Sequence, residues 1–246
     1  MRVPGTRPGQ AASQAIDRAS EVVADKIAEV KPRLRGWMHA GSVPLLTAAF
    51  AVLIVLSPTA ITRVGSAVFA GSAILLFTVS GIYHRGNWSP RLWAFWRRLD
   101  HANIFVLIAG TYTPFVFLYL HGRVRWTLFG IVWGCALAGM VFKLARPDAA
   151  RWLSTPLYIA LGWMAAVFIP HWIDGADAFP TWVNVTVFTL VATGGILYTI
   201  GGLVYATKRP DPSPEWFGFH EIFHAFTVAA FVCQYIAVSI ATYQLR

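Results

Sequence analysis

Charged side chains are scarce in this sequence, and they leave long stretches of the chain without any charge. Only 13% of the residues are Asp, Glu, Lys or Arg, about half the share found in ordinary soluble proteins. About 20 apolar residues in a helix cross the hydrocarbon core of a bilayer, and a helix satisfies its own backbone hydrogen bonds in lipid. Seven charge-poor stretches predict spans near 38–56, 64–84, 99–120, 124–145, 152–173, 181–206 and 217–242. The expected fold class is therefore an all-α integral membrane protein, a seven-transmembrane helix bundle.

Cysteine is scarce as well, and a secretion signal is missing. The two cysteines, Cys135 and Cys233, both fall inside expected spans, which favours ordinary packing over a disulfide framework. Residues 1–35 contain no apolar core of the kind that a cleavable signal peptide requires. We therefore expect neither disulfides nor cleavage of a signal peptide.

The basic residues indicate how the chain sits in the membrane. The formal net charge is +9, which on a soluble surface would favour nucleic acid. Here, however, all of the 20 Lys and Arg fall in segments on one side of the expected spans, apart from Arg63, Arg123, Arg125 and Arg246. The positive-inside rule then predicts a cytoplasmic N-terminus, an external C-terminus and a location in the cell membrane. The partners expected are membrane lipids, and no nucleic acid is expected.

The N-terminal residues differ in composition from the rest of the chain. Residues 1–32 form a polar leader, and the transmembrane domain is expected to occupy 33–246. Apolar residues recur at steps of three and four between about 13 and 31, which predicts a short amphipathic helix. That helix would lie on the inner membrane surface or cover the cytoplasmic ends of the spans; a solvated leader helix without function fits equally well.

Ionisable side chains at membrane depth gather near one end of the expected bundle. Ser80 and His84 close the second span, Asp100 opens the third, and His220 and His224 open the seventh. The two histidines of the seventh span are four residues apart and share one helical face. Three neutral imidazoles with an open fourth position are typical of catalytic zinc, so we expect Zn²⁺ bound by these three histidines. The alternative is that the same histidines cap helices and bond one another at a wet interface.

The two residues beside the histidines have expected catalytic roles. Asp100 would act as the general base, bind the water or orient a ligand. Ser80 or the metal would stabilise the developing oxyanion of a cleaved carbonyl compound.

A second metal-binding pattern overlaps the first. The stretch His220-Glu-Ile-Phe-His224 matches H-E-x-x-H, in which the Glu is the general base of a metalloprotease. The usual third ligand downstream is missing here. Successive residues are also about 100° apart around a helix, so Glu221 faces away from the histidines. A structural role for Glu221 is therefore favoured over a role as the base.

The other histidines carry weaker expectations. His39 opens the first span and is either a partner of the metal ligands or an ordinary interfacial histidine. His101 follows Asp100 but faces elsewhere on its helix, whereas His121 and His171 belong to the outer side and are expected to be solvated.

As a set, the motifs resemble the bacterial hemolysin III family. They are Ser80-Gly-Ile-Tyr-His84, Leu99-Asp-His-Ala-Asn-Ile104, Ala109-Gly-Thr-Tyr-Thr-Pro-Phe115 and Phe219-His-Glu-Ile-Phe-His224. That family is similar to the progestin and adipoQ receptors, including the adiponectin receptors, and more distantly to the alkaline ceramidases. The resemblance implies seven helices, a cytoplasmic N-terminus and zinc on His84, His220 and His224, with Asp100 and Ser80 beside it.

The chain departs from the family at the start of the first span. The family commonly has a Glu…Asn…Thr-His motif there, whereas this chain reads Arg35-Gly-Trp-Met-His39. Only the histidine matches, so the roles of the Glu and Asn do not transfer.

Three functions are compatible with these features. The first is a zinc-dependent hydrolase that cleaves a lipid amide or ester at the inner leaflet, with a lipid as substrate. The second is a non-enzymatic sensor or regulator of membrane state in which zinc staples the helices. The third is a pore-forming cytolysin, which the uniformly apolar spans disfavour.

Overall fold

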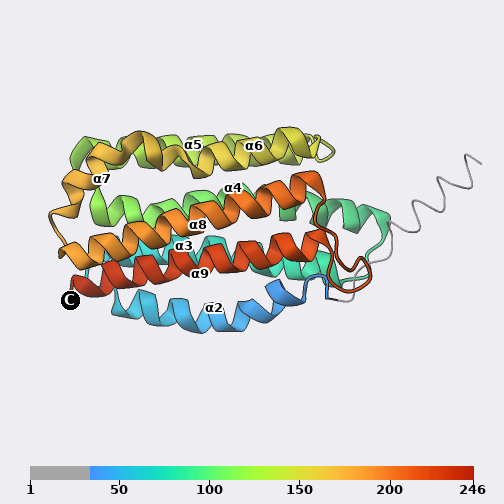
Figure 1. Cartoon of the computed structure of the whole chain (residues 1–246), viewed down its shortest axis with the longest axis horizontal. Coiled ribbons are helices and arrows are strands. Elements are labelled where there is room, and N and C mark those ends of the chain that lie inside the picture. The colour runs from blue at the N-terminus through green and yellow to red at the C-terminus, as the bar shows by residue number, and fades with distance from the viewer. Residues whose placement is uncertain (1–33) are drawn as a thin grey trace, which may run out of the picture.

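Seven long helices lie side by side in the computed structural model, which describes residues 34–246 (Figure 1). Within this range each of the seven is long and apolar enough to cross a membrane. The elements are α2 (Trp37–Leu56), α3 (Ala60–Arg85), α4 (Pro90–Tyr119), α5 (Gly122–Ala145), α6 (Arg151–Gly162), the 3-10 helix η1 (Met164–Phe168), α7 (Ile169–Ala176), α8 (Thr181–Thr207) and α9 (Phe219–Gln244). The expected seven-transmembrane helix bundle is confirmed. The leader 1–32, with its expected amphipathic helix, lies outside the described residues.

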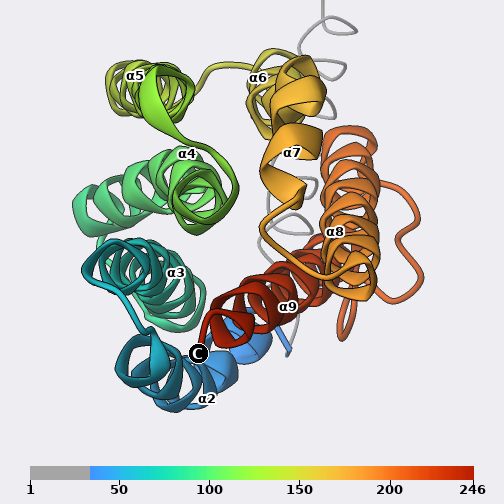
Figure 2. The same ribbon diagram turned by 90° about the vertical axis from the view of Figure 1, so that its left-hand side faces the viewer.

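The helices follow one another around an open ring. Seen end-on, the order runs from α5 through α4, α3 and α2 to α9, α8 and the α6–α7 pair (Figure 2). The most extensive packing joins α8 to α9 and α3 to α4, while α9 meets α2 and α4 over a much smaller area. Aromatic rings fill the centre of the bundle. Phe50 contacts Phe69 and Phe77 contacts Phe231 edge to face, and a tilted contact between Phe69 and Phe231 joins the two pairs.

The fifth span is broken near its middle. An α-helix was expected over 152–173, but the chain passes from α6 through Trp163 and η1 to α7. Pro170, at the start of α7, has no N–H and its ring crowds the carbonyl four residues earlier, which disfavours a continuous α-helix through this turn.

Tyr112 of α4 makes hydrogen bonds to backbone groups at this break. Its hydroxyl lies 2.6 Å from the Gly162 carbonyl and 3.1 Å from the Leu161 carbonyl, and it accepts the Ala165 N–H at 2.9 Å. Unsatisfied backbone groups at membrane depth cost several kcal/mol each. Tyr112 belongs to the Ala109–Phe115 motif, and this contact gives that motif a structural role in the bundle.

One expected loop is largely helical. Residues 85–98 were expected to connect two spans, yet α4 begins at Pro90, with Ser89 as its N-cap. Proline is favoured at the first helical position, where a missing N–H costs nothing, so the apolar window alone placed the start of this helix too late. The proline-rich segment between α8 and α9 is irregular as expected, with one isolated β-bridge between Ser213 and Phe217.

Candidate metal centre

Three helices bring the expected site residues to one end of the bundle, here called the histidine end. Ser80 and His84 lie in the last two turns of α3, Asp100 lies in the third turn of α4, and His220 and His224 lie in the first two turns of α9. The starts of α2 and α6 lie at the same end (Figure 1). Ser80, His84 and His224 are buried, and His220 is half-buried.

The three expected ligands converge. The Nε2 atoms of His84 and His220 are 3.2 Å apart, and one nitrogen from each of His84, His220 and His224 lies within 4.8 Å of the others. Two imidazoles on one tetrahedral zinc, with Zn–N bonds of about 2.0–2.1 Å, place their nitrogens roughly 3.3 Å apart. The donor set is also the one that zinc prefers. This group of side chains could therefore hold a metal ion.

Asp100 lies against the same group. Its Oδ2 atom is 3.7 Å from His84 Nε2, and the buried Ser80 side chain lies beside the carboxylate. The structure thus brings together all five residues that the sequence singled out. Their roles as ligands, base and oxyanion donor remain predictions.

His101 lies 3.9 Å from Asp100, measured between its Nδ1 and the Asp100 Oδ2 atom, and its hydrogen bonds are made to other residues. Its Nδ1 lies 2.8 Å from the Arg97 carbonyl, which only accepts, so Nδ1 donates; in the neutral ring Nε2 then accepts from the Tyr205 hydroxyl at 3.0 Å. Tyr158 donates to the His101 carbonyl at 3.1 Å. Sequence reasoning overlooked Tyr205, because a tyrosine near the end of an apolar helix has the pattern of an interfacial aromatic residue.

Glu221 faces away from the histidines, and both of its carboxylate oxygens accept hydrogen bonds. It is 1% exposed; one carboxylate oxygen accepts from Arg35 Nε at 2.9 Å, and the other accepts the Gly218 N–H at 2.9 Å. The second bond caps the start of α9. A carboxylate with both oxygens bonded in this way has the structural role that the sequence favoured.

His39 lies directly against a candidate ligand. Its ring is 2% exposed, stacks on His224 with ring centroids 3.9 Å apart, and meets the edge of Phe77. Among the described residues neither of its nitrogens has a hydrogen-bond partner. The sequence left His39 either as a partner of the candidate ligands or as an ordinary interfacial histidine. Its stack on His224 fits the first of these interpretations. His121 and His171, in contrast, are exposed, as expected.

Comparison with known proteins places the chain in a family. The family model described as Haemolysin-III related matches residues 27–235. The chain belongs to the hemolysin III family. It is 32% identical over 182 residues to a protein named Hemolysin-3 from Bacillus cereus, covering 73% of this chain and 76% of the relative. It is also 35% identical over 141 residues to a Hemolysin-3 homolog from Bacillus subtilis (strain 168), covering 57% of this chain and 60% of that protein. The resemblance seen in the motifs is thereby confirmed.

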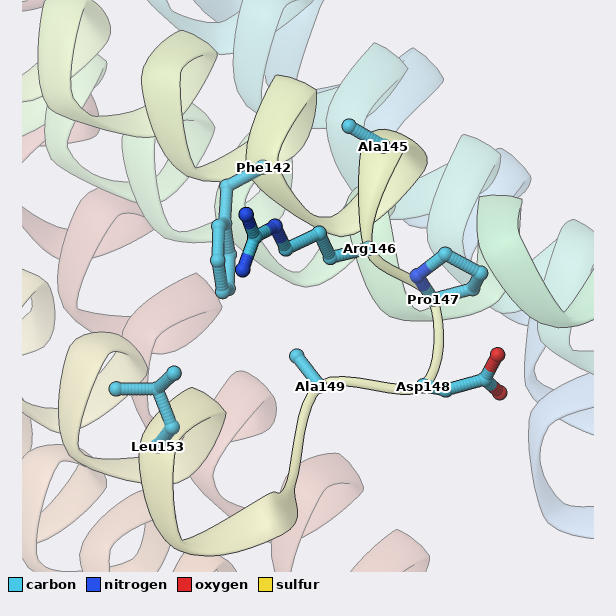
Figure 3. A pocket seen from close by; sticks show the side chains of 7 residues that line it. All are labelled: Phe142, Ala145, Arg146, Pro147, Asp148, Ala149 and Leu153. Carbon is cyan, nitrogen blue, oxygen red and sulfur yellow. The ribbon is translucent and has the colours of Figure 1, made fainter.

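The surface of this hemolysin III family member has two hollows between neighbouring helices. One, of about 410 Å³, lies between the end of α5 and the start of α6, where Arg146 lies beside the Phe142 ring and Asp148 points away from it (Figure 3). It contains none of the expected site residues, and Asp148 is paired with Arg97 at 2.7 Å.

The second hollow, of about 440 Å³, lies between α2 and α3. Its lining is mainly apolar: Ala40, Val43, Thr78, Gly81, Ile82, Arg85, Gly86 and Trp88. Ala40 follows His39 and Arg85 follows His84 in the chain. Neither hollow is lined by an expected site residue, but this one is lined by residues that follow His39 and His84 in the chain.

Proposed function

We propose that this hemolysin III family protein is a zinc-dependent hydrolase that cleaves an amide or ester bond of a lipid at the inner leaflet of the cell membrane. The observation that carries the proposal is the convergence of three imidazoles with the Asp100 carboxylate, 3.7 Å from His84, at one end of helices long enough to cross a membrane. His84, His220 and His224 would hold the ion. Bound zinc supplies a Lewis acid and activates water near neutral pH.

The side chains around the ion have complementary roles in this proposal. Asp100 accepts the proton of the attacking water, because its Oδ2 atom lies 3.7 Å from His84 Nε2 in the ligand group. Ser80, beside Asp100, donates to the oxygen of the scissile carbonyl as negative charge develops there. Glu221 takes no part in the proton transfer, because both of its oxygens are already bonded.

The charge pattern supports a cytoplasmic location for the histidine end. Nearly all Lys and Arg fall in segments on that side of the spans, which is the cytoplasmic side by the positive-inside rule. Substrate then reaches the centre sideways from the inner leaflet. The apolar hollow between α2 and α3 is the position that we propose for an acyl chain.

A non-enzymatic regulator is the second candidate, and one observation favours it. The candidate ligands come from α3 and α9, and α9 packs far less on α2 and α4 than on α8. A metal ion there would hold two weakly joined parts of the bundle together. A pore is a poor third candidate although the relatives carry the name hemolysin, because aromatic rings fill the bundle centre.

Hydrolysis of labelled lipids separates these candidates. Zinc-loaded protein in detergent is given ceramides and phospholipids with a labelled acyl chain, and fatty acid release is measured for the wild type and for Asp100→Asn. The matched control is Asp148→Asn, a carboxylate at the same end with an 84% exposed side chain.

We expect release by the wild type and the control, and release at least about 100-fold slower by Asp100→Asn. A wild type with full zinc occupancy that releases nothing from any lipid would contradict the hydrolase proposal. If Asp100→Asn also leaves the cellular phenotype intact, the regulator is favoured.

A further inference from the structure

The segment in which this chain departs from its family contacts both helices that carry the candidate ligands. It reads Arg35-Gly-Trp-Met-His39, and its last three residues are the first three of α2. Four of its five residues make a specific contact with α3 or α9, and each contact involves a candidate ligand or a residue beside one. Taken in order, these contacts indicate what the segment does.

Arg35 holds the start of α9. Its Nε donates to Glu221 at 2.9 Å, and the Glu221 carboxylate is 1% exposed. Glu221 follows His220 directly and precedes His224 by three residues, so the ion pair fixes the turn that carries both histidines. A charged hydrogen bond to a buried carboxylate is roughly twice as strong as a neutral one.

Gly36 and Trp37 hold the end of α3. Gly36 has φ of 79°, a conformation that favours glycine, and a Cβ at this position would lie 2.8 Å from the His84 Cβ. The Gly36 backbone therefore lies too close to His84 for residue 36 to carry a side chain without displacing it. The Trp37 ring lies 3.5 Å from the guanidinium carbon of Arg85, a cation–π contact with the residue after His84.

His39 lies between the two helices. Its ring stacks on His224 of α9 at 3.9 Å and meets Phe77 of α3 at 4.7 Å, centroid to centroid. The His224 ring can therefore turn only by displacing a buried neighbour. Stacked and edge contacts between rings of this kind contribute beyond the area that they bury.

Helix ends are the places where a helix frays, and the candidate ligands are at helix ends. His84 is the second-last residue of α3, and His220 is the second residue of α9. We propose that Arg35, Gly36, Trp37 and His39 form a clamp that joins the end of α3 to the start of α9 and positions the three histidines for the metal. Arg35, Glu221 and His39 are positioning residues that act through the ligands. The clamp rests on the metal site of the proposed function and is independent of hydrolysis.

Metal affinity tests the clamp without any substrate. Zinc dissociation constants are measured by competition with a chromogenic chelator in detergent, and bound Co²⁺ is followed by its visible absorption. The variants are Arg35→Gln, Arg35→Lys, Glu221→Gln, His39→Phe and His39→Ala. The control is Asp148→Asn, which removes the acceptor of the Arg97–Asp148 pair at the same end of the bundle.

We expect Arg35→Gln and Glu221→Gln to weaken zinc binding at least tenfold and to change the Co²⁺ spectrum. Arg35→Lys restores part of the affinity, His39→Phe keeps most of it because the stack remains, and His39→Ala loses it. The control stays within twofold of the wild type. Variants that lower the melting temperature but keep the wild-type affinity and spectrum would overturn the clamp, as would equal losses in His39→Phe and His39→Ala.

Hydrogen exchange separates failure of the clamp from failure of the metal site. Without added metal, amides in the first turns of α9 should exchange faster in Arg35→Gln and Arg35→Lys than in the wild type, whereas the control should match the wild type. Hydrogen exchange still tests the clamp if the wild type binds no metal. Exchange in α9 that is unchanged in the Arg35 variants would overturn the clamp. Faster exchange in them would show a clamp that is structural only.

Discussion

Removing the Tyr112 hydroxyl tests whether this group stabilises the break in the fifth span by bonding its backbone groups. Tyr112→Phe leaves the ring in place but removes one donor and one acceptor. The carbonyl of Gly162, at 2.6 Å, and the N–H of Ala165, at 2.9 Å, then lose their partner. Each unsatisfied buried group costs roughly 1–3 kcal/mol in proteins. Side-chain hydrogen bonds measured within membranes average about 0.6 kcal/mol, because the unfolded state in lipid also finds partners.

The expected loss of stability lies between these two scales. Two hydrogen bonds at the membrane average give about 1 kcal/mol, and two unsatisfied backbone groups at the lower end of the other range give about 2 kcal/mol in the free energy of unfolding. The assay is a denaturation titration with SDS in mixed micelles, followed by tryptophan fluorescence.

Tyr198→Phe is the matched control. Its hydroxyl has no hydrogen-bond partner among the described residues, so the free energy of unfolding should hardly change. If Tyr112→Phe costs no more than Tyr198→Phe, the hydroxyl does not satisfy the break, and the account of the Ala109–Phe115 motif is wrong.

Three further predictions concern packing, surface charge and catalysis. Gly110→Ala should destabilise the bundle by more than about 1 kcal/mol, because its methyl would collide with Ser72; Gly130→Ala, which meets nothing within 4 Å, should be neutral or stabilising in the same SDS titration. Breaking the exposed Arg97–Asp148 pair with Arg97→Gln should change stability by less than about 1 kcal/mol, and a larger loss in the titration would show that the pair is not a surface pair. On a substrate found in the lipid panel, Asp100→Asn should lower turnover by about 100-fold or more with zinc content unchanged, and loss of the zinc instead would make Asp100 a ligand.

The spans and the histidine group could be predicted because their signals are local. A bilayer requires a minimum apolar length, so the charge-free windows predicted seven spans. Their ends lie close to those of the helices except at the early start of α4, and the fifth span is broken within. His220 and His224 share a face by their spacing alone. Ser80, His84 and Asp100 could be added because ionisable residues at membrane depth are rare and tend to be functional.

The remaining features depend on contacts between distant parts of the chain. Arg35 and Glu221 are 186 residues apart, so no local sequence pattern could predict their ion pair. Tyr112 lies in an apolar stretch, and its role depends on a break in another span. The early start of α4 was signalled by Pro90 after Ser89, but hydropathy dominated that prediction.

Metal content tests the central claim most directly. Zinc per chain is measured by mass spectrometry on detergent-purified wild type and on the His220→Ala, His224→Ala double variant, with folding of both checked by circular dichroism. The account predicts about one zinc per chain in the wild type and little in the folded double variant. The absence of zinc and of any other metal from both proteins would contradict it and leave the histidines as hydrogen-bonding partners within a seven-helix bundle.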